Sequence, residues 1–494
     1  MNREKNKNLI FYEIYPTSFY DSNDDGIGDL EGIRQKLPYI KDLGFNAIWL
    51  NPCFKSPFKD GGYDIEDFFD IDPKFGTLKD LENLLDSAHE MGIKIILDLV
   101  AGHASEDNKD FLESAKPVRN DKYDLFIWNN SVWENEAGYR LIAGRHQRNG
   151  AFMVNFFAHQ PAFNYGFNNI EYHSWQIYYK DERTFAARNY MLDVMRFYLK
   201  MGADGFRVDM ADSLVKNDPD KSATIDVWRY MFNIIRKEYP DAFFVAEWSY
   251  PHRAFAAGFD CDFVLDHWDN FYHRLARSTK ETRGVSVLNG GDLSHFIRDL
   301  NERVYIAKES HGLLGIISGN HDTPRVKNFL DESRTRLFYL IMFTLPGVPF
   351  MLYGDEIMME TADIPSKDGG FARTGSRTPM QWDESVNAGF SKTKGELYLP
   401  VNKANKNNVK AMQSDKNSIY YFIKELINIR KNDEDLLSDD YDLTEYNRLI
   451  TIKRGNKRLV INLSDHNVNL DGEVIISTSK EKGILTPYTG ALIK

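Results

Sequence analysis

The sequence predicts an α/β protein built on a (β/α)8 TIM barrel, with a subdomain inserted after the third strand and a C-terminal antiparallel β-domain. Three observations support this fold class. Short apolar runs alternate with longer stretches of helical periodicity over about the first four hundred residues. The periodicity disappears between residues 104 and 172. After residue 437, polar and apolar residues alternate between turn sequences such as "RGNK" and "LDGE". Repeated strand–helix units favour a parallel barrel, and strict alternation favours an antiparallel sheet.

Eight apolar segments are candidates for the barrel strands. The segment "IKIILDLV" lies between Gly92 and Gly102 and is nearly continuously apolar, which indicates a strand buried on both faces. The stretches between strands, such as "TLKDLENLLDSAHEMG", repeat apolar residues every three or four positions, as helices do. The predicted strands lie within residues 10–16, 47–52, 93–100, 203–210, 242–248, 261–268, 313–322 and 349–356.

These patterns divide the chain into four parts. The inserted stretch is too long for a plain loop, so we expect a small domain at the rim of the barrel. The alternating tail is expected to form a β-sandwich. The predicted parts are residues 1–103 (first part of the barrel), 104–172 (inserted subdomain), 173–436 (second part of the barrel) and 437–494 (C-terminal β-domain).

The composition argues against several classes of partner. A net charge of −12 disfavours nucleic acid and anionic membranes, because both need a basic surface. Two cysteines, Cys53 and Cys261, are too few for a disulfide scaffold. No apolar run reaches the roughly 18 residues of a membrane span, and "MNREKNKNLIFYE" lacks the apolar core of a signal peptide. We therefore expect a cytoplasmic protein, a monomer or weak homo-oligomer, that uses no organic cofactor.

The segment "DSNDDGIGDL", residues 21–30, places oxygen-bearing side chains at alternating positions. Its spacing matches the first ligands of a helix–loop–helix calcium site, but the twelfth position is Gly32 instead of a bidentate Glu. The preceding "NLIFYEIYPTSF" is typical of a strand, whereas that site needs a helix. We therefore predict a metal-binding loop of another kind, with the ligands Asp21, Asn23, Asp25, the carbonyl of Ile27, and Asp29.

Charged side chains follow four of the predicted strands, at the end of a barrel where catalytic groups sit. A single Asp at such a place is more often a helix N-cap, and an Arg beside it is often its ion-pair partner. Several buried carboxylates together cost several kcal/mol unless something offsets the cost, so their convergence indicates a functional site. The residues are Asp98 and His103 after the third strand, Arg207 and Asp209 after the fourth, Glu247 and Trp248 after the fifth, and His321, Asp322 and Arg325 after the seventh.

These groups suit glycoside hydrolysis in an aromatic-rich setting. One carboxylate attacks the anomeric carbon and a second donates a proton to the leaving oxygen. Arg207 lies two residues before Asp209 on one strand, so both point to the same side, and we expect Arg207 to hold Asp209 ionised as a nucleophile. Glu247 lies between "FFVA" and a tryptophan, an apolar setting that would raise its pKa as an acid requires. Asp322 with His321 is expected to bind sugar hydroxyls.

The motifs resemble the signatures of the α-amylase family of retaining glycoside hydrolases, family thirteen, in the expected order along the whole chain. "DLVAGH" resembles the first signature, "GFRVDMADS" the second, "AEW" the third, "NHD" the fourth and "QPAFNY" the fifth. "GSRTPMQWDESVNAGFS" resembles a loop of oligo-1,6-glucosidases, α-glucosidases, trehalose synthases and their relatives. The resemblance implies an exo-acting enzyme that cleaves α-glucosidic bonds of short α-glucooligosaccharides.

The resemblance also implies a role for each residue of these motifs. Asp209 is implied as the nucleophile, Glu247 as the acid/base and Asp322 as the third carboxylate. Arg377 is implied to pair with Asp64, which also binds sugar hydroxyls, and so to close the pocket beyond the terminal glucose. The loop at residues 21–29 resembles the D-x-N-x-D-G-x-G-D loop that holds a structural Ca²⁺ or Mg²⁺ in oligo-1,6-glucosidase-like members. The other implied substrate-binding residues are Tyr63, His103, Phe163, Arg207, Trp248 and His321.

Two departures from the family pattern keep alternatives open. Gly102 stands where many members have an Asn that binds a calcium ion between the barrel and the inserted domain, so we expect no such ion. Met210 follows the nucleophile, where α-1,6- and α-1,4-specific members carry other residues, and it leaves the linkage undetermined. The alternatives are an endo-acting α-amylase or neopullulanase-like enzyme, and a transglycosylase or trehalose-forming isomerase. A non-catalytic member would be expected to lack one of the three carboxylates, and all three are present.

Overall fold

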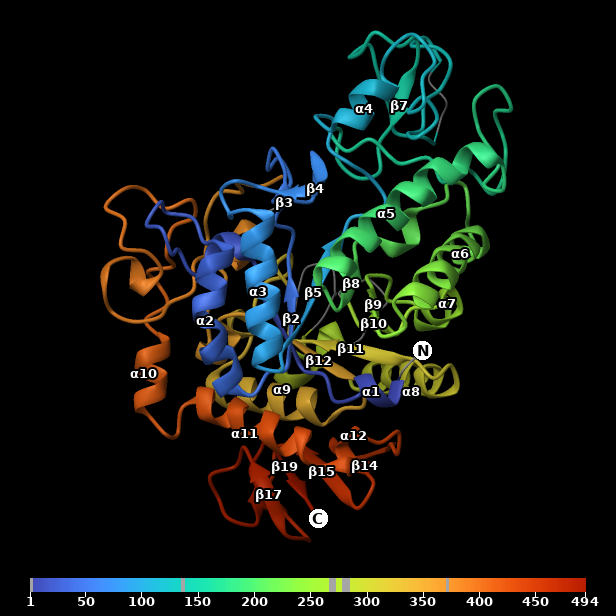
Figure 1. Ribbon diagram of the computed structural model, residues 1–494. Coiled ribbons are helices and arrows are strands. Elements are labelled where there is room, and N and C mark those ends of the chain that lie inside the picture. Colours follow the sequence, from blue (N-terminus) through green and yellow to red (C-terminus); the bar gives the residue numbers. More distant parts are fainter. Residues whose placement is uncertain (1–2, 135–137, 266–271, 278–284, 370–372) are drawn as a thin grey trace.

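Eight parallel strands close into a barrel at the centre of the molecule (Figure 1). The computed structural model describes residues 3–134, 138–265, 272–277, 285–369 and 373–494. Each predicted strand segment overlaps one barrel strand, and the end of the sixth segment, residues 266–268, lies outside the described residues. The barrel strands are β1 (Phe11–Ile14), β2 (Ala47–Leu50), β5 (Lys94–Leu99), β8 (Gly205–Val208), β9 (Phe243–Ala246), β10 (Cys261–Phe263), β11 (Leu313–Ile317) and β12 (Val348–Leu352), which pair in chain order with β12 closing on β1.

The interior of the barrel is filled by aromatic side chains. Successive residues of a strand point to opposite faces, so each strand sends alternate residues inward. The ring of Phe11 stacks on that of Phe350 at 4.3 Å and on that of Phe243 at 5.7 Å between centroids. Residues of the other face, such as Tyr12 and Ile48, are buried against the surrounding helices. Because the middle of the barrel is solid, a substrate site has room only at the ends of the strands.

Helices surround the barrel and connect its strands (Figure 1). Helix α3 begins with a capping box between Thr77 and Asp80, and α5 ends at Gly202, which adopts the left-handed conformation that glycine tolerates. No helix in the described part of the chain is long and apolar enough to cross a membrane. The helices are α1 (Arg3–Asn6), α2 (Leu30–Leu43), α3 (Leu78–Glu90), α4 (Lys109–Ser114), α5 (Phe185–Met201), α6 (Ser222–Glu238), α7 (Pro251–Ala257), α8 (Ser294–Glu309), α9 (Glu332–Thr344), α10 (Val409–Ser414), α11 (Ile419–Lys431) and α12 (Glu434–Leu437), besides short 3-10 turns.

The segment between β5 and α5 leaves the barrel and returns to it, as the sequence predicts for an insertion after the third strand. It carries α4 and the small antiparallel pair β6 (Leu141–Ala143) and β7 (Ala151–Met153). Figure 1 shows it above the barrel, near the pair β3 (Phe54–Lys55) and β4 (Asp67–Ile71). An isolated bridge joins His103 to Ala162, so the insertion is tied to the end of β5.

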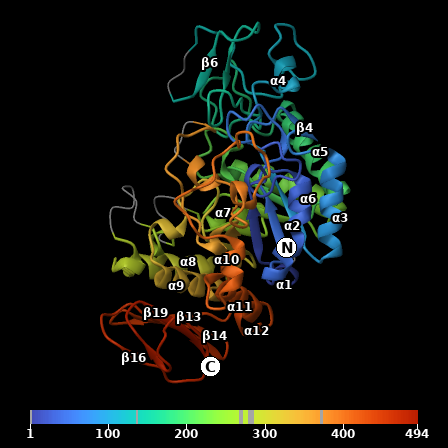
Figure 2. The same ribbon diagram turned by 90° about the vertical axis from the view of Figure 1, so that its left-hand side faces the viewer.

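The C-terminal region is an antiparallel β-domain at the opposite end of the barrel (Figure 2). Its main sheet has the order β13-β14-β15-β19-β17 and contacts α9, most of whose residues are buried. The strands are β13 (Asp442–Tyr446), β14 (Leu449–Arg454), β15 (Lys457–Asn462), β17 (Val474–Ser477) and β19 (Thr489–Ile493), with a separate pair β16 (Val468–Asn469) and β18 (Ile484–Leu485).

Candidate active site

A cavity of about 630 Å³ lies at the carboxyl ends of the barrel strands. The three carboxylates singled out from the sequence, Asp209, Glu247 and Asp322, all line it, although they follow three different strands. Its remaining lining residues are Asp60, Tyr63, His103, Phe156, Met210, Asp212, Trp248, Tyr250 and Arg373.

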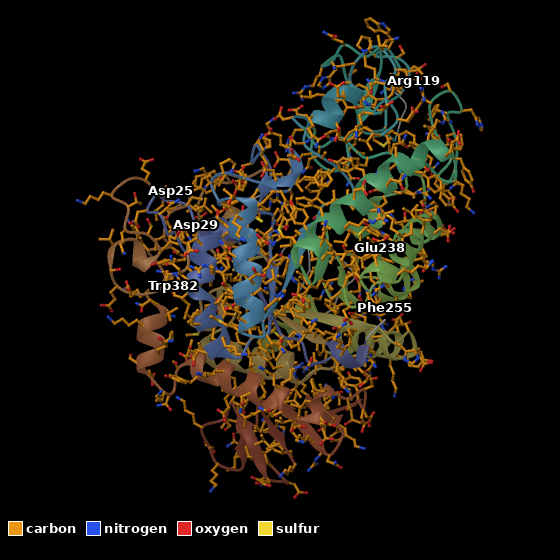
Figure 3. All side chains as sticks on the ribbon, in the orientation of Figure 1. Asp25, Asp29, Arg119, Glu238, Phe255 and Trp382 are labelled. Atoms are coloured by element: carbon orange, nitrogen blue, oxygen red, sulfur yellow. The ribbon has the colours of Figure 1, made fainter. Side chains whose placement is uncertain are left out.

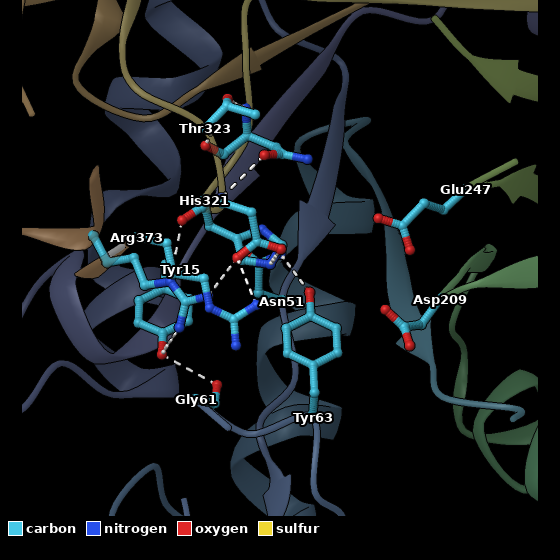
Figure 4. Close-up of polar contacts among 12 residues, drawn as sticks. Tyr15, Asn51, Gly61, Tyr63, Asp209, Glu247, His321, Thr323 and Arg373 are labelled. Atoms are coloured by element: carbon cyan, nitrogen blue, oxygen red, sulfur yellow. Dashed lines mark hydrogen bonds and ion pairs between the residues drawn. The ribbon is translucent and has the colours of Figure 1, made fainter. Parts of the chain in front are cut away.

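A single guanidinium at the base of the cavity binds three acids. Arg207 is 1% exposed, and its Nη1 lies 2.6 Å from Asp98 Oδ1 and 3.1 Å from Asp209 Oδ1. Its Nη2 lies 2.6 Å from Glu247 Oε1. Figure 4 shows the carboxyl groups of Asp209 and Glu247 facing the same space. Burial alone would lower the pKa of Arg207, but the neighbouring acids raise it well above its ordinary value, so Arg207 is charged.

The pKa of Asp209 differs from what the sequence argument expects. Burial and the facing Glu247 carboxyl raise the pKa of Asp209 well above its ordinary value, and Arg207 only partly opposes them. The sequence predicts that Arg207 holds Asp209 ionised; in the structure Arg207 lowers the pKa of Asp209 without cancelling the effects of burial and of Glu247.

Asp322, in contrast, is held ionised by its neighbours. Its Oδ1 lies 2.5 Å from Nη2 of Arg377 and 3.2 Å from Nη1 of Arg373, and His321 Nε2 lies 3.4 Å from Oδ2. Burial raises the pKa of Asp322, but His321 and the two guanidinium groups outweigh it and hold the pKa well below the ordinary range. The cavity therefore contains Asp322, which is held ionised, and Asp209, whose pKa is raised.

Tyr63 and His103 form one wall of the cavity. The hydroxyl of Tyr63 donates to Asp98 Oδ2 at 3.0 Å, and its ring lies parallel to that of His321, 5.3 Å away between centroids. His103 Nε2 lies 3.1 Å from the carbonyl oxygen of Tyr63, and burial lowers the pKa of His103 to about 3. A neutral His103 therefore donates its Nε2–H to this carbonyl.

The ion pair at one end of the cavity differs from the predicted one. Asp64 is fully buried and accepts hydrogen bonds from the backbone N–H groups of Lys59 and Asp60. Arg377 contacts Asp322 instead of Asp64. The pairing of Asp64 with Arg377 is therefore wrong, because the tight "KDGGYD" turn folds Asp64 back onto its own backbone.

The neighbouring residues Asp60 and Arg373 form the ion pair that reaches the cavity. Gln160 of the insertion donates to the same Asp60 carboxylate at 2.6 Å, and Arg373 also contacts Asp322. Burial raises the pKa of Asp60 to about 6, and Arg373 opposes that rise. The loop after β3, the insertion and the loop before residue 377 thus meet at this end of the cavity.

Not every residue implied as substrate-binding reaches the cavity. Tyr63, His103 and Trp248 line it, whereas Arg207, His321 and Arg377 are buried directly behind the lining acids. Phe163 is fully buried, stacks on Phe126 at 4.6 Å between centroids and also contacts Tyr190 of α5, so it belongs to the main hydrophobic core.

Gly102 lies against two polar side chains, which a side chain at this position would displace. A Cβ atom at Gly102 would lie 2.6 Å from Asn155 Nδ2 and 2.8 Å from Ser213 Oγ. Lys216 donates to Asn155 Oδ1 at 2.6 Å and to the carbonyl oxygen of Ser213 at 2.5 Å. The ammonium group of Lys216 thus joins the insertion to the barrel at this junction.

The loop predicted to bind metal lies between β1 and α2, and Figure 3 labels Asp25 and Asp29 near the start of that helix. The donor atoms are of the kind that Ca²⁺ and Mg²⁺ prefer. As placed, however, the oxygens of Asp21 accept backbone N–H groups of residues 23, 24 and 26, and Asp29 caps α2. Across the described residues, no three His, Cys, Asp or Glu side chains converge as a metal site. The ion stays a prediction from the sequence.

Several residues of the site escaped the reasoning from sequence. Asp60 and Arg373 each lie four residues before a residue that was used, Asp64 and Arg377, so a four-residue shift would have found them. Asp212 lies within "GFRVDMADS" but was not singled out. Phe156 and Tyr250 lie outside the quoted motifs, and only the fold brings them to the cavity.

Comparisons with known proteins identify the family of the chain. The family model for the alpha amylase catalytic domain matches residues 13–440. The chain is 31% identical to an alpha-glucosidase of Apis mellifera (86% of this chain, 78% of the relative) and 33% identical to the trehalose synthase/amylase TreS of Mycolicibacterium smegmatis (80% and 70%). It is 30% identical to an oligo-1,6-glucosidase of Heyndrickxia coagulans (98% and 98%).

Solved structures show the same fold at lower identity. The trehalulose synthase MutB superposes with a TM-score of 0.82 at 23% identity, and the trehalose-6-phosphate hydrolase of Bacillus licheniformis with 0.80 at 24%, each over 99% of both chains. The cavity is lined by acids that follow three barrel strands, and the family model covers most of the sequence. The chain belongs to the alpha-amylase family and is a glycoside hydrolase.

Proposed function

We propose that the protein is an exo-acting, retaining α-glucosidase that releases glucose from short α-glucooligosaccharides. The observation that carries the proposal is the ion pair of Asp60 and Arg373 at the Asp322 end of the cavity. An ion pair that blocks this end would admit only the terminal sugar and leave the remainder of the chain to the part of the cavity lined by Trp248 and Tyr250. Aromatic faces there suit the apolar faces of a second sugar.

In the first step the glycosidic bond is cleaved with the help of Asp209 and Glu247. Asp209 attacks the anomeric carbon of the terminal glucose, and Glu247 donates a proton to the leaving oxygen. Arg207 contacts both carboxyls, so it stabilises the negative charge on Asp209 as Asp209 attacks. Asp322, held ionised by Arg377 and Arg373, binds sugar hydroxyls and favours a distorted ring.

The second step releases glucose with its configuration retained. Glu247 now takes a proton from a water molecule, which attacks the glucosyl ester on Asp209. If a sugar hydroxyl replaces that water, the same intermediate gives a transglycosylation product. The similarity to a trehalose synthase/amylase makes such transfer the second candidate function.

The experiment is a product profile with maltotetraose, isomaltotriose, panose and trehalose. We expect α-glucose as the only early product, identified by chromatography and by the anomeric signal in NMR spectra. The substrate that reacts fastest gives the linkage preference.

Early release of mixed oligosaccharides would contradict the exo-acting assignment, and early β-glucose would contradict retention. New disaccharides without free glucose would favour the transferase candidate.

A further inference from the structure

A buried acid that the mechanism does not use, Glu13, lies behind the site. It belongs to β1, is fully buried, and places Oε1 2.7 Å from Nδ1 of His321. Its other oxygen, Oε2, has no hydrogen-bond partner among the residues that the structure describes. A lone acid inside the apolar segment "FYEIYP" is costly, so its contact with His321 needs an explanation.

The ring of His321 is held in one orientation. It is fully buried and lies parallel to the rings of Tyr63 and Tyr15, at 5.3 Å and 6.2 Å between centroids (Figure 4). Its Nδ1 faces Glu13, and its Nε2, which has no hydrogen bond in the described part of the chain, lies 3.4 Å from Asp322 Oδ2. With the ring fixed, whether Nε2 carries a hydrogen depends only on where the protons of Glu13 and His321 lie.

The charges around the pair oppose a negative charge on it. Glu13 faces Asp98 and Arg207, and His321 faces Asp322. The nearby guanidinium groups already contact acids, since Arg207 binds Asp98 while Arg373 and Arg377 bind Asp322. In addition, burial raises the pKa of Glu13 and lowers the pKa of His321. The pair is most stable with no net charge, with one proton on the carboxyl and one on the imidazole.

The contacts decide where these two protons lie. A proton on Oε2 would have no acceptor, whereas a proton on Oε1 is shared with Nδ1 at 2.7 Å. Nδ1 then needs no proton of its own, so the imidazole proton stays on Nε2. There it faces the ionised Asp322, which attracts an N–H group and repels a bare nitrogen.

We propose that Glu13 is a positioning residue that shares its proton with His321 and so keeps a hydrogen on Nε2 beside Asp322. This N–H then faces the Asp322 carboxylate, which is the group that meets the sugar in the cavity. The identity of that sugar rests on the proposed function, whereas the position of the proton does not.

The variant Glu13→Gln tests the sharing of the proton. Two N–H donors lie 3.3 Å from Oε1, the backbone N–H of His321 and Nδ2 of Asn51. The amide oxygen of Gln, which can accept from both, is therefore expected at the position of Oε1. We expect Nδ1 to donate to this oxygen, which takes a position 2.7 Å from Nδ1 and so lies closer than Nδ2 of Asn51 at 3.2 Å, and Nε2 is then left bare. We expect kcat/KM for α-glucosyl fluoride, whose leaving group needs no proton from Glu247, to fall on the order of 10- to 100-fold.

The direct measurement is the ¹⁵N chemical shift of His321 in enzyme labelled with ¹⁵N-histidine, assigned by the signal lost in His321→Gln. We expect a protonated Nε2 in the parent protein and a bare Nε2 in Glu13→Gln. The matched control is Glu356→Gln, the same change at another fully buried acid, which binds Tyr12 and Tyr39 and does not line the cavity. It should keep both the parent chemical shifts and the parent kcat/KM.

A bare Nε2 in the parent protein would overturn the inference, whether or not Glu13→Gln folds. A protonated Nε2 that persists in Glu13→Gln would overturn it as well. A parent protein with the expected chemical shifts but no activity on α-glucosides would contradict the proposed function and leave the role of Glu13 intact.

Discussion

At the scale of single residues, the site is controlled by how each carboxyl is paired. Asp322 has two guanidinium partners and is ionised, whereas Asp209 and Glu247 share the single guanidinium of Arg207. One positive charge cannot fully compensate two buried carboxylates, so the pKa of Asp209 is raised. A retaining mechanism needs two neighbouring carboxyl groups of this kind, one as the nucleophile and one as the acid.

The variant Glu247→Gln should separate the two roles. We expect kcat/KM for maltose to fall about 10²- to 10⁴-fold, because the leaving oxygen no longer receives a proton. The kcat/KM for α-glucosyl fluoride should change far less, and initial-rate measurements on both substrates check this.

The variant Asp209→Asn should lose turnover of both substrates while its thermal unfolding stays cooperative. An equal loss on both substrates in Glu247→Gln would contradict its assignment as the acid.

At the scale of elements, loops from separate parts of the chain build the closed end of the cavity. Asp60 comes from the loop after β3, Gln160 from the insertion and Arg373 from the loop before residue 377. We propose that these contacts limit which substrates enter the cavity and do not reach the bond that is cleaved. Its removal should therefore change selectivity more than the chemical step.

We expect Asp60→Asn to open this end of the cavity. The ratio of kcat/KM for maltopentaose to that for maltose should rise about 5- to 10-fold, equivalent to about 1 to 1.4 kcal/mol. Product analysis should show that cleavage at internal bonds has appeared.

The control is Asp107→Asn, which removes an exposed acid paired with Lys59 and should leave the ratio unchanged. An unchanged ratio in Asp60→Asn would argue against closure by this ion pair.

We propose that the loop between β1 and α2 binds Ca²⁺ or Mg²⁺. A chelator should then lower the Tm by an amount on the order of a few degrees, and added Ca²⁺ or Mg²⁺ should restore it, because the ion binds only the folded chain. Asp25→Asn should weaken the response, since Asp25 is a predicted ligand. A Tm that is equal in chelator and in excess metal would disprove the proposal.

At the scale of the whole molecule, buried arginines join the C-terminal sheet to the barrel. Arg454 of β14 is fully buried and donates to carbonyl oxygens of Thr344, Leu436, Ser438 and Asp440. Thr344 ends α9, which packs between the barrel and the sheet, so the two regions are expected to unfold together.

We expect Arg454→Ala to lower the free energy of unfolding by roughly 3 kcal/mol, because several buried carbonyl groups lose their donor. Denaturant titration followed by fluorescence and circular dichroism measures the change.

The matched control is Arg458→Ala on the neighbouring strand β15, whose side chain is exposed and which should change the free energy by about 0.5 kcal/mol or less. A loss in Arg454→Ala no greater than in this control would contradict a role for Arg454 in docking the sheet.

The sequence determined the barrel, the insertion, the C-terminal sheet and the three lining carboxylates. These follow from local signals, namely hydrophobic periodicity and motifs at strand ends, and parallel strands bring their carboxyl ends to one face. "GFRVDMADS" therefore located Arg207 and Asp209 without knowledge of any contact.

The tertiary structure decided the pairing and protonation of those groups. Asp60 binds Arg373, while Asp64 accepts hydrogen bonds from its own turn. The pKa of Asp209 is raised. Glu13 contacts His321, which lies 308 positions away in the sequence. Such outcomes depend on distances of a few ångströms and on exclusion of water, because Coulomb and desolvation terms change steeply there. Neither quantity is encoded in the identity of a residue or in its neighbours along the chain.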